Sequence, residues 1–264
     1  MFLLNPKYYI PLCEQLAERN KDDSLRIWSY SRIDTVKRPE VLKLVRKAGI
    51  KWLALGIESG ERSVRLEVDK GKFEVVDVRK VIQKVPEADI NVMANYIFGL
   101  PGDTKETVKK TFDLSLELCT AGWNTYGAMA LPGSFLYKKA LDEGKQLPDT
   151  YEGFSFHSYE TLPLSTEKLS AKEIITLRDE AFNQYHNHKP FLNLIEKKFG
   201  KVKEYEKIKM DKIGSRIVRL IYFSYSDDFP LKWEIYCYSG KSGWQVLDLN
   251  VNTNFYDLFD KVDQ

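Results

Sequence analysis

The stretch that decides the fold is residues 51–60, KWLALGIESG, an almost continuous apolar run that ends in a glycine-bounded turn. Such a run is typical of a strand covered on both faces, as in a parallel sheet. The preceding residues 38–47 place apolar side chains at helical spacing, with Pro39 near the start and Gly49 after the end. The sequence therefore predicts a helix followed at once by a buried strand.

The same alternation extends to both sides of this stretch. Strands are predicted over Leu25–Tyr30, Lys51–Ile57, Asn91–Phe98 and Asn124–Ala130. Further helices are predicted over Val75–Val85 and from Asp103 to about Ala121, where Asp103 and Glu106 resemble a capping box. Strands that alternate with helices indicate right-handed βα units, so the fold class is α/β, with adjacent parallel strands in a sheet or barrel.

Glycine-rich turns follow three of these strands. Residues 56–60 read GIESG, residues 98–103 read FGLPGD and residues 130–133 read ALPG. In parallel α/β folds ligands bind beyond the carboxyl ends of the strands, and Glu58 and Ser59 offer hydrogen bonds there. The alternative is that these residues only turn the chain and that Glu58 faces water.

Composition indicates an ordinary globular protein. Of the 264 residues, 43% are hydrophobic and 30% are charged, and 40 basic against 38 acidic side chains leave a net charge of +2. This balance favours neither nucleic acid nor an anionic membrane as a partner. No apolar stretch approaches the ~18 residues of a membrane span, and the first residues do not resemble a secretory signal, so we expect a cytoplasmic protein.

The cysteines and histidines form no metal-ligand pattern. Cys13, Cys119 and Cys237 are widely separated, and three scattered thiols in a cytoplasmic chain are typical of small buried apolar residues. The three histidines match neither a nucleophile triad nor a histidine-rich metal site. We therefore predict no metal ligands in this chain.

Several long segments, in order, resemble radical S-adenosylmethionine enzymes of the cobalamin-binding type, especially those of sugar and surface-polysaccharide gene sets. The resemblance runs from Ile27 to about Gly200. Its segments are WSYSRIDTV (28–36), VLKLVRKAGIKWLALGIESGERSVRLEVDKGKF (41–73), INVMANYIFGLPGDTKETVKKTFDLSLEL (90–118), YGAMALPGSFLY (126–137) and HSYETLPLSTEKLSAKEIITLRDEAFNQY (157–185). Several ordered segments are more specific than one short motif.

This resemblance implies a (β/α) barrel in which a four-iron four-sulfur cluster binds S-adenosylmethionine and cleaves it reductively to a 5′-deoxyadenosyl radical. The cluster is held in the family by a CxxxCxxC loop after the first strand, and this chain contains no CxxxCxxC. Residues 1–5 are similar to the family's segment after the second strand. We therefore expect an incomplete barrel whose first two strands and cluster ligands are missing, with cobalamin bound, if at all, by a missing N-terminal domain.

The resemblance also assigns candidate cofactor contacts. Glu58 and Ser59 match positions that face the ribose and methionine groups, and Phe98 and Gly99 match positions beside the adenosyl group. Ala130 and Leu131 match the edge that contacts adenine through backbone atoms.

Each of three further side chains has two possible roles. Arg32 is a candidate partner for a carboxylate, with an ion pair to Asp34 or Glu58 as the alternative. Tyr30 and Tyr126 point toward the barrel mouth as substrate contacts or as packing residues, and packing is the more common role.

The chain after Gly200 has a different composition. Three aromatic-rich strands are predicted over Ile213–Ser224, Leu231–Ser239 and Gly243–Val251, with a hairpin turn at 239–243. They weakly resemble the last strands of nuclear-transport-factor-2-like domains. The mixed charges of residues 201–212 indicate a solvated segment. We predict a partial barrel with C-terminal helices over 1–200 and a small antiparallel β-rich unit over 201–264.

Two function classes follow. The chain is a portion of a radical S-adenosylmethionine enzyme, inactive alone and with an unknown small-molecule substrate, which the resemblance suggests to be a sugar or polysaccharide precursor. Alternatively it is a truncated or fused non-catalytic product that binds a partner. In either case the strand at 25–30 leaves an open edge, through which the missing half or a second copy would pair.

Overall fold

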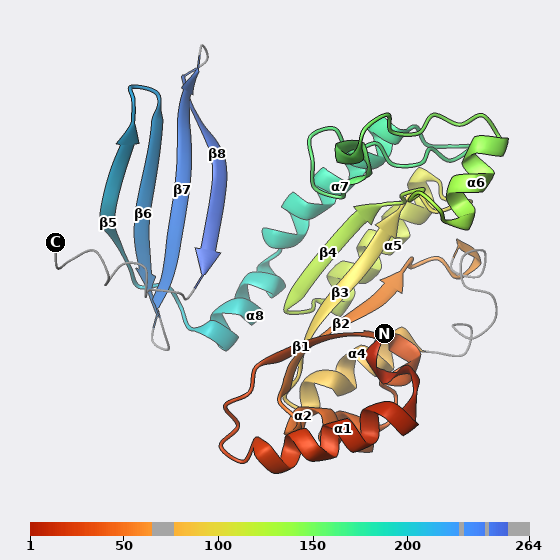
Figure 1. Ribbon diagram of the computed structural model, residues 1–264, viewed down its shortest axis with the longest axis vertical. Helices are drawn as coiled ribbons and strands as arrows, with labels where there is room; N and C mark the ends of the chain where they lie inside the picture. Colours follow the sequence, from red (N-terminus) through yellow and green to blue (C-terminus); the bar gives the residue numbers. More distant parts are fainter. Residues whose placement is uncertain (65–76, 227–229, 241–242, 253–264) are drawn as a thin grey trace. The chain divides into compact units, whose positions relative to one another are not determined.

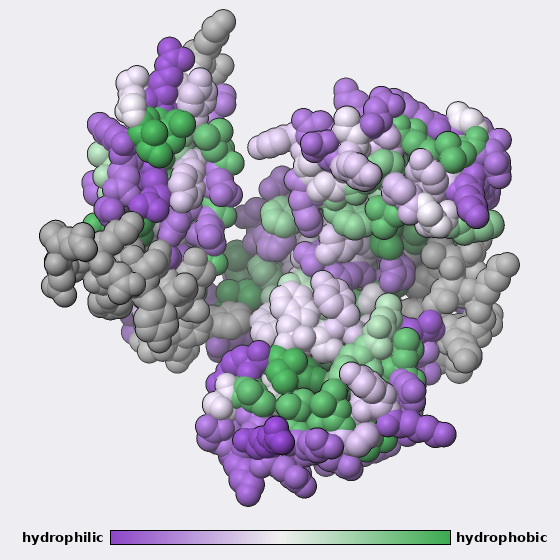
Figure 2. All heavy atoms as spheres, viewed as in Figure 1, coloured by the Kyte–Doolittle hydropathy of each residue, from purple (hydrophilic) through white to green (hydrophobic). Residues whose placement is uncertain are grey.

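A computed structural model describes residues 1–64, 77–226, 230–240 and 243–252. The chain divides into two compact units, Met1–Phe191 and Leu192–Gln264. The unit boundary expected near Gly200 stays a prediction. Figure 2 shows green apolar patches among purple hydrophilic side chains on both units.

The first unit contains a four-stranded parallel sheet in the order β1-β2-β3-β4 (Figure 1). Its strands are β1 (Ile27–Arg32), β2 (Ile50–Glu58), β3 (Asn91–Phe98) and β4 (Gly122–Gly127). All four predicted strands are therefore present, adjacent and parallel, and the α/β fold class is confirmed. In the described residues the sheet is open, with β1 and β4 at its edges, and forms no closed barrel.

Helices connect and cover these strands. They are α1 (Pro6–Arg19), α2 (Pro39–Lys47), α4 (Val78–Glu87), α5 (Lys105–Leu118), α6 (Phe135–Asp142), α7 (Ala171–His186) and α8 (Lys189–Phe199), with 3-10 turns η1 (Phe2–Leu4), η2 (Ile33–Thr35) and η4 (Tyr151–Phe154). Within the described part of the chain, no helix is long and apolar enough to cross a membrane. The predicted start of the helix at Val75 lies outside the described residues.

The parallel sheet has one covered face and one more exposed face. Along β3 every second residue is buried, and α4, α5 and α7 pack against this strand. Trp123 of β4 stacks on Tyr185 of α7, with ring centroids 4.9 Å apart, so both lie on the helix-covered face. The alternation places the intervening residues, including Asn95 and Asn124, on the exposed face.

The start of α5 differs in detail from the prediction. Thr104, rather than Asp103, is the N-cap residue, and it forms a capping box with Thr107 instead of Glu106. Asp103 is drawn away because its carboxylate accepts the N–H groups of Gly99 and Leu100 at 3.0 and 2.9 Å. Its side chain therefore closes the turn after β3 instead of the first turn of α5.

The second unit contains an antiparallel sheet in the order β5-β6-β7-β8. Its strands are β5 (Glu204–Ile213), β6 (Ile217–Tyr225), β7 (Pro230–Gly240) and β8 (Gly243–Asn252). The three predicted strands are present, while the solvated segment expected at 201–212 is largely the strand β5. Its side chains are mostly exposed because it is an edge strand, and mixed charges on such a strand resemble a loop in sequence. Residues 241–242 of the predicted hairpin turn lie outside the described residues.

Candidate functional site at the carboxyl ends of the parallel strands

One residue from each parallel strand forms a polar row across the exposed face near its carboxyl end. The strand register pairs Arg32 with Gly56, Gly56 with Asn95, and Asn95 with Asn124. We call these four residues the polar row. Asn124 Nδ2 donates to Asn95 Oδ1 at 3.2 Å, and Tyr126 Oη donates to the same oxygen at 3.5 Å. The row therefore offers a guanidinium group and amide groups to a ligand.

Glu58 adds a carboxylate to this row. The pairing of β2 with β3 shifts between Gly56 and Glu58, and Glu58 has a positive φ of 65°. A Cβ atom at Gly56 would clash with Oε1 of Glu58, so the Glu58 side chain lies back over Gly56. A non-glycine residue in the left-handed region costs about 1–3 kcal/mol and often marks a binding site. The missing side chain at position 56 makes room for the carboxylate.

Arg32 forms the ion pair that the sequence offered as its alternative role. Its Nε lies 3.0 Å from Asp34 Oδ1 and its Nη2 lies 3.3 Å from Asp34 Oδ2. Both side chains are mostly buried, with 22% and 18% exposed. The pair fixes the guanidinium at the β1 end of the polar row.

Ser59 is placed on the covered side of the strand end. It is fully buried, and its Oγ lies 3.1 Å from Thr111 Oγ1 of α5. The same Oγ accepts the N–H of Glu61, while Thr111 Oγ1 accepts the N–H of Gly60 at 2.9 Å. Ser59 therefore holds the GIESG turn against α5.

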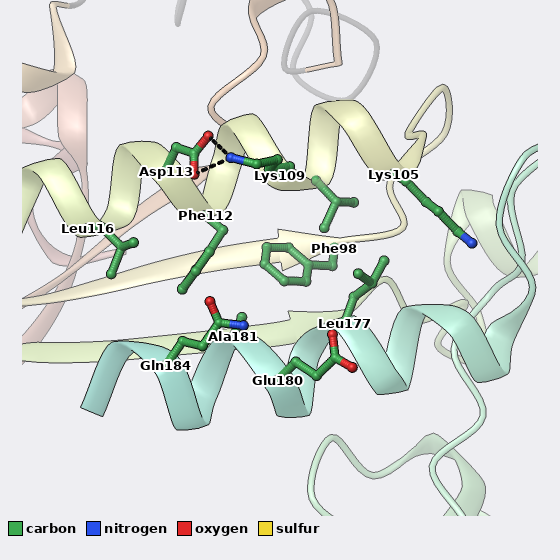
Figure 3. A pocket seen from close by; sticks show the side chains of 11 residues that line it. Phe98, Lys105, Lys109, Phe112, Asp113, Leu116, Leu177, Glu180, Ala181 and Gln184 are labelled. Carbon is green, nitrogen blue, oxygen red and sulfur yellow. Dashed lines mark hydrogen bonds and ion pairs between the residues drawn. The ribbon is translucent and has the colours of Figure 1, made fainter. Parts of the chain in front are cut away.

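Phe98 and Gly99 lie at the end of β3, at the same edge of the sheet as Glu58. The Phe98 ring points into a groove between α5 and α7 (Figure 3). By the alternation along β3, it lies on the face opposite Asn95. Gly99 has a φ of 79°, and a Cβ atom there would lie 2.5 Å from Cδ1 of Ile174. Both residues are buried, the Gly99 N–H donates to Asp103 Oδ2, and Phe98 O accepts the Ala128 N–H.

The groove that receives Phe98 has a volume of about 360 Å³. Apolar side chains of α5 and α7, among them Phe112 and Leu177, form its walls, and Lys109 pairs with Asp113 at its rim (Figure 3). The polar row lies on the opposite face of the sheet. We therefore place the candidate site at the polar row and not in this groove.

The Asp103 side chain stabilises the turn after β3. Its carboxylate is nearly fully buried, accepts the Gly99 and Leu100 N–H groups, and also accepts the Thr107 hydroxyl at 2.6 Å. Burial raises the pKa of Asp103. The buried carboxylate of Asp103 holds the backbone of Gly99 in place. The sequence analysis had instead predicted that Asp103 caps the following helix.

Ala130 and Leu131 lie beyond the strand to which the sequence assigned them. β4 ends at Gly127. The next residue, Ala128, donates its N–H to Phe98 O at the end of β3, and its carbonyl oxygen accepts the N–H of Leu164, both at 2.8 Å. Ala130 is buried beside Ala140 and Leu164, and Leu131 is 43% exposed.

The two tyrosines lie on the exposed face. Tyr30 is 60% exposed, while Tyr126 packs against Phe156 and His157 with ring centroids 5.0 and 5.8 Å away. Burial, followed by the nearby Tyr30, raises the pKa of Tyr126. Tyr126 is a packing residue that also touches the polar row.

Asn95 and Asn124 were not identified from the sequence. Each lies inside a strand and alternates with apolar residues, a pattern that also describes a solvated strand face. The signal that could have found them is that both occupy exposed-face positions three residues before the end of their strands.

One family model matches part of the chain. Residues 3–115 match the model of the Radical SAM superfamily, a little less than half of the chain. This match agrees with the resemblance seen in the sequence segments.

Similar curated proteins are larger enzymes. The chain is 30% identical over 159 residues to anaerobic magnesium-protoporphyrin IX monomethyl ester cyclase of Cereibacter sphaeroides, covering 59% of this chain and 24% of that protein. It is 21% identical over 179 residues to bacteriochlorophyllide d C-12(1)-methyltransferase of Chlorobaculum tepidum, covering 67% of this chain and 38% of that protein. The chain therefore spans a quarter to two fifths of these relatives. Neither name refers to a sugar.

Two solved structures are similar in part. The radical S-adenosylmethionine methyltransferase TsrM of Kitasatospora setae, solved with cobalamin and a [4Fe-4S] cluster, aligns over 49% of this chain and 26% of its own, at 23% identity and a TM-score of 0.43. Coproporphyrinogen III oxidase (HemN) of Escherichia coli aligns over 84% of this chain and 50% of its own, at 13% identity and a TM-score of 0.45.

The cysteines of this chain do not fit an iron–sulfur cluster. Cys13 is fully buried on α1, Cys119 ends α5, and Cys237 lies on β7 in the other unit. Burial raises the pKa of Cys13 to about 11 and also raises that of Cys119, which disfavours the thiolate form that binds iron. Within the described residues no three histidine, cysteine or acidic side chains gather around a common point.

Proposed function

We propose that the first unit supplies the S-adenosylmethionine-binding face of a radical S-adenosylmethionine enzyme and does not cleave this cofactor alone. The observation that carries the proposal is the polar row with the Glu58 carboxylate held over Gly56. A carboxylate suits the ammonium or ribose hydroxyl groups of S-adenosylmethionine, and Arg32 suits its carboxylate. The backbone of the exposed Leu131 offers a further expected contact.

Calorimetric titration of S-adenosylmethionine into the full chain tests this binding role. We expect measurable binding that Glu58→Gln and Asn95→Ala each weaken at least fivefold. Glu61→Gln is the matched control, because the Glu61 carboxylate pairs with Lys110 Nζ at 3.0 Å. Absence of binding at millimolar ligand, or binding that neither site variant weakens, would overturn the proposal.

The second part of the proposal concerns the reaction. Because the chain has no CxxxCxxC and its three cysteines are widely separated in the sequence, anaerobic reconstitution with iron and sulfide should yield no stoichiometric four-iron cluster. Iron and sulfide analysis, the visible absorption spectrum and chromatography for 5′-deoxyadenosine check this prediction. A full cluster with turnover would show that other ligands hold iron.

The substrate remains open in this proposal. The sugar or polysaccharide precursor suggested by the sequence resemblance has no support from the names of the similar enzymes. Cobalamin use and a cytoplasmic location rest on the sequence alone, and both stay predictions.

The alternative is a non-catalytic module that pairs through β1. Trp28 and Tyr30 are 49% and 60% exposed at this edge, and the Trp28 ring lies 6.0 Å from that of Trp52. An exposed edge strand with aromatic side chains is suited to strand addition. Hydrogen exchange measured across a range of chain concentrations tests it: protection of residues 27–32 that rises with concentration supports pairing, and constant fast exchange argues against it.

A further inference from the structure

The exposed face of the parallel sheet carries large side chains next to the polar row. Because side chains alternate along a strand, positions two or four residues before a member of the row lie on the same face. These positions include Trp28 and Tyr30 of β1, Trp52 of β2 and Met93 of β3. We call these four residues the aromatic floor.

The three rings of the aromatic floor are nearly parallel. The ring centroids of Trp28 and Trp52 are 6.0 Å apart with 24° between the ring planes, and those of Trp28 and Tyr30 are 6.2 Å apart with 29° between the planes. The two rings of β1 are about half exposed. Rings at this spacing and angle can accept a further ring in the same offset arrangement.

Small residues beneath the rings allow the floor to lie flat. Ala54 pairs with Tyr30 and with Met93 and is only 1% exposed, so the larger side chains around it close over it. A Cβ atom at Gly122 would lie 2.5 Å from Cε of Met93 and 3.2 Å from Cζ3 of Trp52. The Trp52 ring therefore reaches across β3 toward β4 instead of standing away from the sheet.

The exposed face thus has an apolar half and a polar half. No residue of the aromatic floor is charged, whereas the polar row that follows it carries a guanidinium and amide groups, and Glu58 adds a carboxylate. A protein layer packed over the whole face would remove water from these groups, which costs free energy. A small molecule that is apolar over most of its area and polar along one edge matches both halves.

The flatness of the floor selects a planar ligand. All atoms of a planar ring contact an indole or phenol face at once, whereas half of the atoms of a puckered ring are held away from it. Successive side chains on one face of a strand are about 6.6 Å apart. A fused-ring molecule that lies on Trp28 and Tyr30 therefore brings a polar substituent within reach of the polar row.

We propose that the aromatic floor binds the substrate of this enzyme, a planar, uncharged fused-ring molecule with polar groups along one edge. That the bound molecule is the substrate rests on the proposed function, whereas ring binding by the floor does not depend on it. With S-adenosylmethionine held at the polar row, the ring system lies beside this cofactor on the same face of the sheet.

Ligand-observed NMR titration of the full chain tests ring binding with two matched probes. Naphthalene-2-carboxamide is planar, and its decahydro analogue has the same carbon skeleton and amide but puckered rings. We expect the planar amide to bind and its analogue to bind at least about fivefold more weakly. Trp28→Leu should weaken the planar amide by a similar factor. Trp244→Leu removes an exposed indole from β8 of the second unit and, as the matched control, should leave binding unchanged.

Circular dichroism confirms that each variant is folded, and Tyr30→Leu is the second floor variant if Trp28→Leu disturbs the fold. No binding at millimolar planar amide, equal binding of the decahydro analogue, or binding that survives both floor variants would overturn the proposal. So would Trp28-dependent binding of methyl glucoside in place of the amide, which would indicate a sugar site. A chain that binds the amide but not S-adenosylmethionine would overturn the proposed function and retain the ring site, and the converse would overturn the ring site alone.

Discussion

Two glycines show how single residues shape the candidate site. Gly56 and Gly99 lie near the carboxyl ends of neighbouring strands, but they face different atoms. A Cβ at Gly56 meets only the flexible end of Glu58, whereas a Cβ at Gly99 meets Ile174 of a packed helix and would have to adopt a φ of 79°. The first glycine makes room for a functional group, and the second allows the chain to turn.

The different surroundings of Gly56 and Gly99 predict that an alanine substitution has a different effect at each position. Gly56→Ala should weaken S-adenosylmethionine binding and change stability little, because the Glu58 side chain can swing away. Gly99→Ala should lower the free energy of unfolding by about 1–3 kcal/mol, because alanine is strained in the left-handed region. Titration calorimetry and urea denaturation of both variants check the pair. Equal losses of stability would contradict this division of roles.

At the scale of elements, the start of α7 is tied to the start of α5. Ser170 and Glu173 form a capping box, and Glu173 Oε1 also lies 2.7 Å from Lys105 Nζ. Hydrogen bonding to Lys105, and then to Ser170, lowers the pKa of Glu173 to about 2. Since α7 covers β3 and β4, this contact helps to hold the covered face of the sheet.

A pH dependence follows with a definite sign. A carboxyl group with a depressed folded pKa stabilises the protein above its unfolded pKa of 4.5, and this stabilisation is lost as pH falls toward about 2. The stability difference between wild type and Glu173→Gln should therefore shrink from pH 6 to pH 3. Urea denaturation at both values measures it, with the exposed Glu167→Gln as control. A difference that is constant with pH would refute the assignment.

The parallel strands could be predicted from the sequence because a long apolar run bounded by glycines adopts few conformations other than a buried strand. Residues 91–98 match β3 at both ends. The edge strand β5 and the polar strand residues Asn95 and Asn124 were missed for one shared reason. Whether the polar side chains of β5, Asn95 and Asn124 face water or another strand depends on the tertiary structure. From the sequence alone, a charged or polar residue indicates only a solvent-exposed position.

The placement of site residues was less predictable than the strands. Glu58 lies at the carboxyl end of β2 with its side chain over Gly56, an arrangement that is set locally. Ser59 and Phe98 instead point to the covered side, since α5 and α7 pack there. A motif fixes which residues stand at a strand end, but the direction of each side chain depends on helices that lie far away in the sequence.

At the scale of the whole molecule, the chain consists of two units that we expect to separate on proteolysis. Gly200–Lys203 is irregular, whereas the following β5 is bonded along its length to β6. Brief trypsin digestion should therefore cut first after Lys201 or Lys203 and leave the lysines of β5 intact. Mass spectrometry of the early fragments checks this, and first cuts after Lys207 or Lys209 would count against it.

The buried thiol on α1 gives the protein an internal reporter. Cys13 is fully buried and its pKa is raised to about 11, so an alkylating reagent reaches a reactive thiolate there only when α1 separates from the core. Cys119 and Cys237 are partly exposed and should be modified earlier. The labelling rate of Cys13 therefore times the opening of the N-terminal helix in an unmodified chain, without any introduced probe.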